Sequence, residues 1–266
     1  MGLQSDCYFA KGSTHKICED YAFAYREGAA RERGGMERIV ILTGAGVSAE
    51  SGLGTFRDEG GLWAQHRIED VATPEAFVRN PDLVHRFYNA RRVQAAEARP
   101  NAAHEALARL QEEFSGEVLL VTQNVDGLHE KAGAVAIHMH GELSRALCAA
   151  CDLRWDSPME MVAGEVCPAC QAPKARPDIV WFGEMPYHME RILGAIHGCD
   201  LFAAIGTSGQ VYPAAGFVEE AQLAGAATVE LNLRDSDMSY AFDQHIVGPA
   251  SQTVPDWVDN LLSGTR

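Results

Sequence analysis

The sequence predicts an α/β protein with a doubly wound parallel sheet, into which a smaller cysteine-rich module is inserted. Two observations lead to this expectation. Short apolar runs alternate with stretches of helical periodicity along most of the chain, whereas the segment from about Leu143 to Val180 is rich in Cys, Pro and Ala and breaks the alternation. Apolar strands separated by helices indicate βαβ units, whose parallel sheet is buried on both faces.

The predicted elements follow in order. Residues 1–35 are mixed in charge and end in Gly34-Gly35, so we interpret them as an N-terminal extension of uncertain order, with Met36 a candidate natural start. Strands are expected at Arg38–Thr43, Val118–Thr122, Ala134–His138, Leu201–Ile205 and Thr228–Leu231. Helices are expected between them, for example at His104–Glu113 and Ala214–Ala224.

Composition narrows the classes of function. The chain has 266 residues, 47% hydrophobic and 22% charged, as in ordinary globular proteins. A formal net charge of −15 argues against direct nucleic-acid binding, which requires clustered Lys and Arg. No apolar run approaches the roughly 20 residues of a membrane span, and no secretory segment opens the chain. Four of the seven cysteines form two C-x-x-C pairs, which indicates metal binding in a cytoplasmic protein.

A glycine-rich turn, Gly44-Ala45-Gly46-Val47-Ser48-Ala49, follows the first strand directly. Its G-x-G-x-x-A pattern permits a tight turn and lets backbone N–H groups approach a pyrophosphate, as in dinucleotide-binding folds. Such turns also occur in parallel sheets without any ligand. The turn departs from the usual dinucleotide fingerprint, because it continues as residues 50–57 (ESGLGTFR) instead of a long apolar helix.

Taken together, the motifs resemble the sirtuin family. The glycine turn continues into Thr55-Phe56-Arg57 and Gly61-Leu62-Trp63, as in the sirtuin NAD loop. Four further segments match in the family's order: residues 122–129 (TQNVDGLH), His140-Gly141-Glu142, Gly206-Thr207-Ser208 and Asn232-Leu233. The resemblance covers roughly residues 36–262. It implies a Rossmann-like NAD-binding domain made of residues 36–142 and 181–266, with a zinc-binding module at residues 143–180.

By this resemblance, NAD is a consumed co-substrate. The residues expected to contact it are Gly44, Ala45, Gly46, Ser48, Ala49, Glu50, Thr55, Phe56, Arg57, Trp63, Gln123, Asn124, Asp126, Gly206, Thr207, Ser208, Asn232, Leu233, Arg234 and Ala250. Two positions depart from the family. Gly54 stands where relatives usually carry Pro or Arg, and Arg234 stands where many carry Glu.

The catalytic residues implied by the resemblance are Asn124, Asp126 and His140. Taken alone, Asn124 is more simply explained as a cap of the next helix, and a histidine near a strand end is more often structural. We expect His138 to be structural and His140 to be the general base, since an ordinary histidine pKa lies near neutrality. In the family mechanism the acyl-lysine oxygen expels nicotinamide, and the histidine then deprotonates a ribose hydroxyl. The products are nicotinamide, O-acyl-ADP-ribose and free lysine.

The cysteine-rich module has the four-cysteine zinc pattern, with the ligands Cys148, Cys151, Cys167 and Cys170. A redox C-x-x-C would not explain two pairs at this spacing. Because four thiolates leave no position open, the zinc ion should be structural.

Tyr88 and Arg91 lie three residues apart in a predicted helix, so they share a face. Taken alone, such a pair is more simply a core tyrosine beside an exposed basic face. The spacing, however, is similar to that of sirtuins that remove succinyl and malonyl groups, and the small Ala72 would leave room for a longer acyl chain. The resemblance therefore implies that Tyr88 and Arg91 bind the distal carboxylate, with deacetylation retained.

A substrate peptide is expected to pair as a strand between Val180–Glu184 and Gly209–Tyr212, with Val180 and Phe182 in contact with it. The expected partners are acylated lysines of proteins, and the chain is expected to be a monomer. The chief alternative is a mono-ADP-ribosyltransferase or NAD hydrolase on the same site. A non-catalytic NAD sensor is disfavoured by the retained His140 and Asn124, and a dehydrogenase by the four-cysteine insert.

Overall fold

The computed structural model describes residues 36–54 and 66–264 of the chain. Its main element is a six-stranded sheet with the order β3-β2-β1-β7-β8-β9, in which every neighbouring pair is parallel. The strands are β1 (Arg38–Thr43), β2 (Glu117–Thr122), β3 (Ala136–His138), β7 (Leu201–Ile205), β8 (Ala227–Asn232) and β9 (Gln244–Val247). The doubly wound α/β fold predicted from the apolar runs is confirmed.

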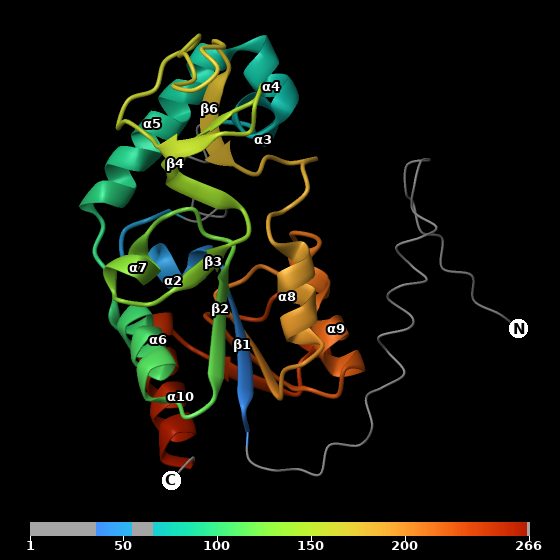
Figure 1. Ribbon diagram of the computed structural model, residues 1–266. Coiled ribbons are helices and arrows are strands. Elements are labelled where there is room, and N and C mark those ends of the chain that lie inside the picture. The colour runs from blue at the N-terminus through green and yellow to red at the C-terminus, as the bar shows by residue number, and fades with distance from the viewer. Residues whose placement is uncertain (1–35, 55–65, 265–266) are drawn as a thin grey trace, which may run out of the picture. The chain divides into compact units, whose positions relative to one another are not determined.

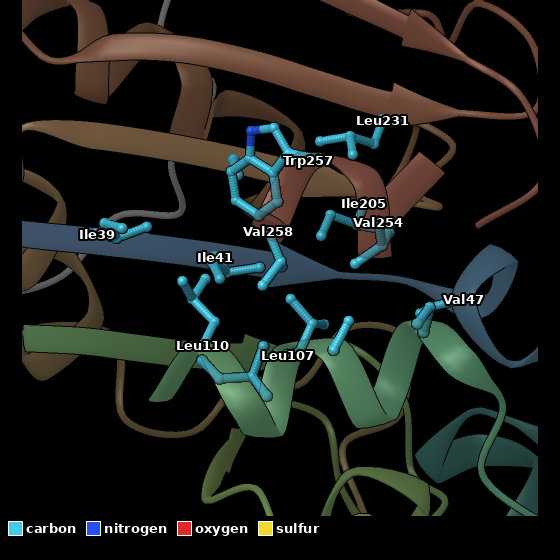
Figure 2. Close-up of a cluster of buried hydrophobic side chains, with 14 of the residues drawn as sticks. Ile39, Ile41, Val47, Leu107, Leu110, Ile205, Leu231, Val254, Trp257 and Val258 are labelled. Atoms are coloured by element: carbon cyan, nitrogen blue, oxygen red, sulfur yellow. The ribbon is translucent and has the colours of Figure 1, made fainter. Parts of the chain in front are cut away.

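Helices cover both faces of this sheet (Figure 1). On one face lie α6 (Ala102–Glu113) and α10 (Ala250–Gly264), and on the other α8 (Met189–Ile196) and α9 (Phe217–Leu223). Alternation along β1 explains the two layers, because Ile39 and Ile41 face α6 and α10 while Val40 and Leu42 face α8 and α9. Figure 2 shows the first of these clusters, with Trp257 of α10 packed over the sheet.

The order of the strands reverses between β1 and β7. From β1 the chain adds β2 and β3 on one side, and it later adds β8 and β9 beyond β7 on the other. In open α/β sheets, ligands bind at such a switch point, just outside the carboxyl ends of the strands. The loops after β1, β2 and β7 therefore mark the expected site, and the short helices α2 (Ala45–Ala49) and α7 (Leu128–Lys131) follow the first two of these strands.

A smaller unit packs beyond this edge (Figure 1). It contains an antiparallel sheet with the order β5-β4-β6, made of β4 (Gly141–Cys148), β5 (Arg154–Asp156) and β6 (Ala175–Ile179). Three helices pack against it: α3 (Ile68–Val71), α4 (Pro74–Arg79) and α5 (Pro81–Glu97). Arg92 of α5 joins helix to sheet, since its Nε donates to the Leu143 carbonyl over 2.8 Å.

Among the helices of the described ranges, none combines the length and apolarity that a bilayer span requires.

Candidate active site

The loops after β1 and β7 approach each other so closely that both need glycine. The Gly44 N–H donates to the Ile205 carbonyl and the Gly46 N–H to the Gly206 carbonyl, each over 2.9 Å. A Cβ atom on Gly44 or Gly46 would lie 2.7 Å from backbone atoms of Gly206. Gly206 itself has a φ of 63°, in the left-handed region. Two segments about 160 residues apart thus form one continuous floor at the switch point.

Three polar side chains converge beside this floor. The Asn124 amide donates to the Gly44 carbonyl and to Ser48 Oγ, each over 3.1 Å, and Ser48 donates to Asp126 Oδ2 over 3.2 Å. All three side chains are buried. Because the Asn124 N–H groups are engaged and no described residue donates to Oδ1, that oxygen remains as an acceptor. The sequence predicted Asn124, Asp126 and Ser48 as site residues, and the structure brings them together.

Two further histidines, His104 and His129, lie buried behind the cluster, and the sequence analysis missed both. His104 Nδ1 accepts from the Asn101 backbone N–H (3.3 Å), so its Nε2 carries the proton and donates to Ser48 Oγ (3.4 Å). His129 Nε2 lies 3.0 Å from Thr43 Oγ1. Burial lowers the pKa of His129 to about 3, which keeps it neutral. His129 closes the 122–129 motif without a role of its own in the sequence analysis, and the contacts of both histidines with Ser48 and Thr43 span 56 and 86 residues, which no local pattern indicates.

His140 and His138 have opposite protonation preferences. His140 Nδ1 lies 3.2 Å from the Gln123 carbonyl, so Nδ1–H donates and Nε2 keeps its lone pair. Burial lowers the pKa of His140, partly opposed by this bond. His138 instead faces two acceptors, the Asn124 carbonyl (3.0 Å) and Glu130 Oε1 (3.1 Å). Burial opposes its protonation, but Glu130 outweighs burial and raises the pKa of His138.

Tyr88 and Arg91 lie on the same face of helix α5, as expected from their spacing. Tyr88 is 1% exposed, and its Oη accepts a 3.0 Å hydrogen bond from Trp181 Nε1. The Arg91 Cζ atom lies 5.9 Å from the centroid of the Tyr88 ring. Ala72, at 3% exposure, belongs to the same buried cluster as Tyr88 and Trp181. The predicted acyl-pocket residues therefore lie together.

The segment after β6 ties this pocket to His140. The Val180 N–H donates to the His140 carbonyl (2.9 Å) and the Phe182 N–H donates to the Ala72 carbonyl (3.0 Å). The Trp181 N–H donates to a carboxylate oxygen of Glu184. All three amides have acceptors within the chain, and the Trp181 carbonyl accepts from the Glu184 N–H (2.9 Å), which leaves the carbonyls of Val180 and Phe182 for pairing with a substrate strand.

The four cysteines of the small unit have the geometry of a zinc site. Their Sγ atoms all lie within 4.8 Å of one another, with 3.6 Å between Cys148 and Cys170 and 3.7 Å between Cys151 and Cys167. Four sulfurs at about 2.3 Å from a tetrahedral zinc would be separated by about 3.8 Å, whereas a disulfide requires about 2.05 Å. The donor set therefore fits the expected metal.

The turns that carry these thiols repeat one design. Asp152 and Gln171, each directly after a C-x-x-C pair, have φ values of 57° and 59°. Their N–H groups donate to the carbonyls of Cys148 and Cys167, over 2.9 and 3.1 Å. Each turn thereby brings the two thiols of its pair to the same side.

Comparison with known proteins decides the family. The model of the Sir2 family matches residues 44–213. The chain belongs to the Sir2 family. The resemblance to sirtuins inferred from the motifs is thus confirmed.

Curated relatives in this family are close in sequence and length. One from Caulobacter vibrioides is 53% identical over 234 residues, covering 86% of this chain and 98% of the relative. One from Bdellovibrio bacteriovorus is 55% identical over 230 residues, covering 85% and 97%. Another, from Escherichia coli K12, is 54% identical over 233 residues, covering 86% and 84%. All three are named NAD-dependent protein deacylase.

Solved Sir2 structures match the fold as well. A Sir2 homologue in complex with NAD is 34% identical, with a TM-score of 0.80, and the match covers 87% of this chain and 91% of that one. A mutant Sir2 homologue in complex with ADP-ribose has the same identity and TM-score, with coverages of 86% and 94%.

The remaining predicted NAD contacts lie on the far side of the glycine loops from Asn124, along the carboxyl ends of β7 and β8. The Asn232 amide donates to the Thr207 carbonyl over 2.6 Å, which joins these two loops. Leu233 and Arg234 are exposed next to it. Ser208 follows Thr207, and its Oγ accepts from the Gln210 N–H.

Some predicted NAD residues are engaged elsewhere or lie outside the described ranges. Glu50 Oε1 accepts from the Ser251 N–H over 3.0 Å, which places it at the start of α10 beside Ala250. Ala45 and Ala49 begin and end α2. The predicted residues that lie outside the described ranges are Thr55, Phe56, Arg57 and Trp63.

Proposed function

We propose that this chain is an NAD-dependent protein-lysine deacylase that prefers short acidic acyl groups and retains deacetylase activity. Its products are free lysine, nicotinamide and O-acyl-ADP-ribose. The observation that carries the proposal is the presence, at the switch point of the sheet, of both a half-buried His140 whose Nε2 lone pair is available and an acceptor oxygen on Asn124. Membership of the Sir2 family, with relatives named deacylases, supports it.

The residues divide the chemistry between them. Asn124 Oδ1 accepts a hydrogen bond from a ribose hydroxyl or a water, and Ser48 and Gly44 hold its amide so that the oxygen keeps its direction. His140 Nε2 takes the proton of a ribose hydroxyl, while Nδ1–H stays bonded to the Gln123 carbonyl and fixes the tautomer. NAD, when bound, supplies the ribose carbon from which nicotinamide departs and the hydroxyl that receives the acyl group.

The zinc site has a separate role. A zinc ion held by the four cysteines would have no open coordination position, so it would stabilise the small unit without touching the chemistry. This unit includes β6 and the segment that follows it, which contacts both Ala72 and His140. An ion pair between Arg176 of β6 and Glu184 joins the strand to this segment.

The acidic preference follows from the chemistry of Tyr88 and Arg91. A guanidinium binds a carboxylate with two parallel hydrogen bonds, and a phenol adds a third. Burial raises the pKa of Tyr88, so the phenol keeps its hydrogen at neutral pH and remains a donor. An acetyl group offers this pair no partner, whereas a succinyl or malonyl group does.

The substrate is an acylated lysine on a protein, and the carbonyls of Val180 and Phe182 support pairing with an extended peptide. Thiols arranged for a metal fit a reducing compartment, in keeping with a cytoplasmic location. We propose that the chain acts as a monomer.

Nicotinamide release tests the proposed reaction against its alternative. The enzyme with NAD alone should release little nicotinamide, and addition of an acetyl- or succinyl-lysine peptide should raise release in step with peptide deacylation. Release at an unchanged rate while both peptides stay acylated would instead establish an NAD hydrolase or an ADP-ribosyltransferase.

A further inference from the structure

We infer that Trp181 is a positioning residue for acidic acyl groups, because its indole N–H fixes the orientation of the Tyr88 hydroxyl and an Arg176–Glu184 pair holds the indole in place. This inference rests on the proposed function and adds to it the contacts that orient the Tyr88 hydroxyl in the acyl pocket. It concerns four residues that come from α5, β6 and the segment that follows β6.

The Trp181–Tyr88 bond has only one possible direction. An indole N–H is a donor and cannot accept, so Tyr88 Oη is the acceptor in the 3.0 Å contact. The hydroxyl hydrogen of Tyr88 must then point elsewhere, and no acceptor for it exists among the described residues. With Arg91 Cζ 5.9 Å from the same ring, the free hydrogen and the guanidinium are placed to meet one anion.

The bond also strengthens the phenol as a donor. A hydroxyl that accepts one hydrogen bond becomes more polarised and donates a stronger one, and burial makes this coupling larger than in water. Tyr88 is 1% exposed and Trp181 is 2% exposed, so water does not compete for either group.

Arg176 and Glu184 hold the Trp181 indole in place. The Arg176 Cζ atom lies 3.6 Å from the centroid of the Trp181 ring, in cation–π contact. The same guanidinium bonds Glu184 with both fork nitrogens, over 2.6 and 2.8 Å, and donates to the Ile179 carbonyl. Glu184 Oε2 in turn accepts from the Trp181 backbone N–H over 2.9 Å.

This closed set of contacts leaves the indole little freedom. Trp181 is fixed at its backbone by Glu184, at its ring face by Arg176 and at its ring edge by Tyr88, and Phe77 packs against it at 5.2 Å between ring centroids. A buried indole N–H requires a hydrogen-bond partner, and here that partner is Tyr88, one of the two polar side chains assigned to the acyl site. The arrangement therefore links substrate selectivity to Trp181, although Trp181 need not touch the acyl group.

Trp181→Phe tests the inference, because phenylalanine keeps an aromatic ring against Arg176 and Phe77 but has no N–H. We expect KM for a succinyl-lysine peptide to rise about 3–10-fold, the effect of one neutral hydrogen bond. KM for the matched acetyl-lysine peptide, and kcat for both, should stay within about twofold. In a Tyr88→Phe background the same change should have no further effect on succinyl KM. Trp257→Phe, which alters a buried indole in the main core, is the matched control.

Indole NMR signals give a second readout that does not require turnover. The chain has four tryptophans, so protein labelled with ¹⁵N-tryptophan gives four indole signals, and Trp181→Phe identifies the one needed. Without NAD, a succinyl-lysine peptide should shift this signal clearly more than an acetyl-lysine peptide does, and Tyr88→Phe should abolish the difference.

The outcomes separate this inference from the proposed function. Equal KM effects of Trp181→Phe on both peptides, or effects that add to those of Tyr88→Phe, would overturn the role of Trp181 while leaving the deacylase intact. If neither peptide is turned over, the deacylase proposal is overturned, and the indole signal then decides the inference alone. An indole signal that responds equally to both peptides would overturn it.

Discussion

Replacement of Arg91 by methionine should convert the enzyme from an acidic-acyl deacylase into a deacetylase. Arg91 lies on α5 one turn from Tyr88, and burial lowers its pKa while leaving it charged at neutral pH. Its fork can form two charge-assisted hydrogen bonds with an acyl carboxylate, each of about 1.5–3 kcal/mol. Allowing for desolvation of the carboxylate, we take the loss as about 3 kcal/mol, or roughly 100-fold in kcat/KM.

The assay compares kcat/KM for succinyl- and acetyl-lysine peptides of one sequence. Arg91→Met should lower the succinyl value about 100-fold and leave the acetyl value within threefold. Arg91→Lys, which keeps the charge but loses the fork, should fall in between. Arg86→Met, at an exposed position of the same helix, should change neither value. Equal losses for both peptides on Arg91→Met would refute the assignment of a carboxylate site.

Four further predictions concern the base, the buried histidines, the metal and the glycine floor. His140→Ala should lower kcat/KM for both peptides at least about 100-fold. In the wild type, kcat/KM should fall on the acidic side of its pH profile with a midpoint below pH 6.5, because burial lowers the pKa of His140. A midpoint above pH 6.5 would contradict this. His129, whose folded pKa of about 3 lies below the ordinary 6.5, stays neutral when folded, so lowering pH from 7.5 to 5.5 should cost about 1.4 kcal/mol of unfolding free energy at this residue. Urea titrations in which His129→Gln leaves the pH dependence unaltered would refute it. Cys167→Ser should abolish the one zinc per chain expected by metal analysis and lower the melting temperature, and an unchanged zinc content would contradict the site. Gly206→Ala should cost about 1–3 kcal/mol of stability and raise KM for NAD, since the new Cβ would lie 2.5 Å from the Val47 nitrogen; a neutral effect would contradict the close approach.

The central strands of the main sheet were predictable from the sequence because they are buried on both faces. The run at β7 is apolar from end to end and that at β1 is apolar over Ile39–Leu42, and the predicted bounds of both strands agree with the structure. At β3 the strand begins two residues later than expected, since the Val135 N–H donates to the Gln111 side chain and Val135 is 79% exposed. The strand β9 was missed because Gln244–Val247 is a short edge strand with mostly exposed residues.

Helical stretches were predictable where they are amphipathic and regular. The helix α6 begins two residues before the expected His104, at an Asn101 cap. The expected helix at Ala214–Ala224 instead opens with a 3₁₀ turn at Ala214–Gly216, and α9 then ends at Leu223.

Within the site, local sequence patterns predicted the residues proposed to bind NAD, zinc and substrate, but not the residues that hold those side chains in position. The glycine turn, the paired cysteines and the residues after β2 are contiguous in sequence and carry recognisable spacing. By contrast, the contact of His104 with Ser48 spans 56 residues and that of Trp181 with Tyr88 spans 93. Such pairs depend on how α6 packs beside α2, and on how α5 packs beside the segment after β6. No periodicity or spacing along the chain encodes these contacts.

Mass spectrometry of both reaction partners tests the central claim most directly. Matched acetyl- and succinyl-lysine peptides would be incubated with the enzyme, with and without NAD, alongside His140→Ala. We expect both peptides to lose their acyl group only with NAD, the succinyl peptide faster, and ADP-ribose to gain the mass of the group lost, with neither change in the variant. Loss of NAD with both peptides unchanged in mass, or an acyl group released as free acid without transfer to ADP-ribose, would contradict the account.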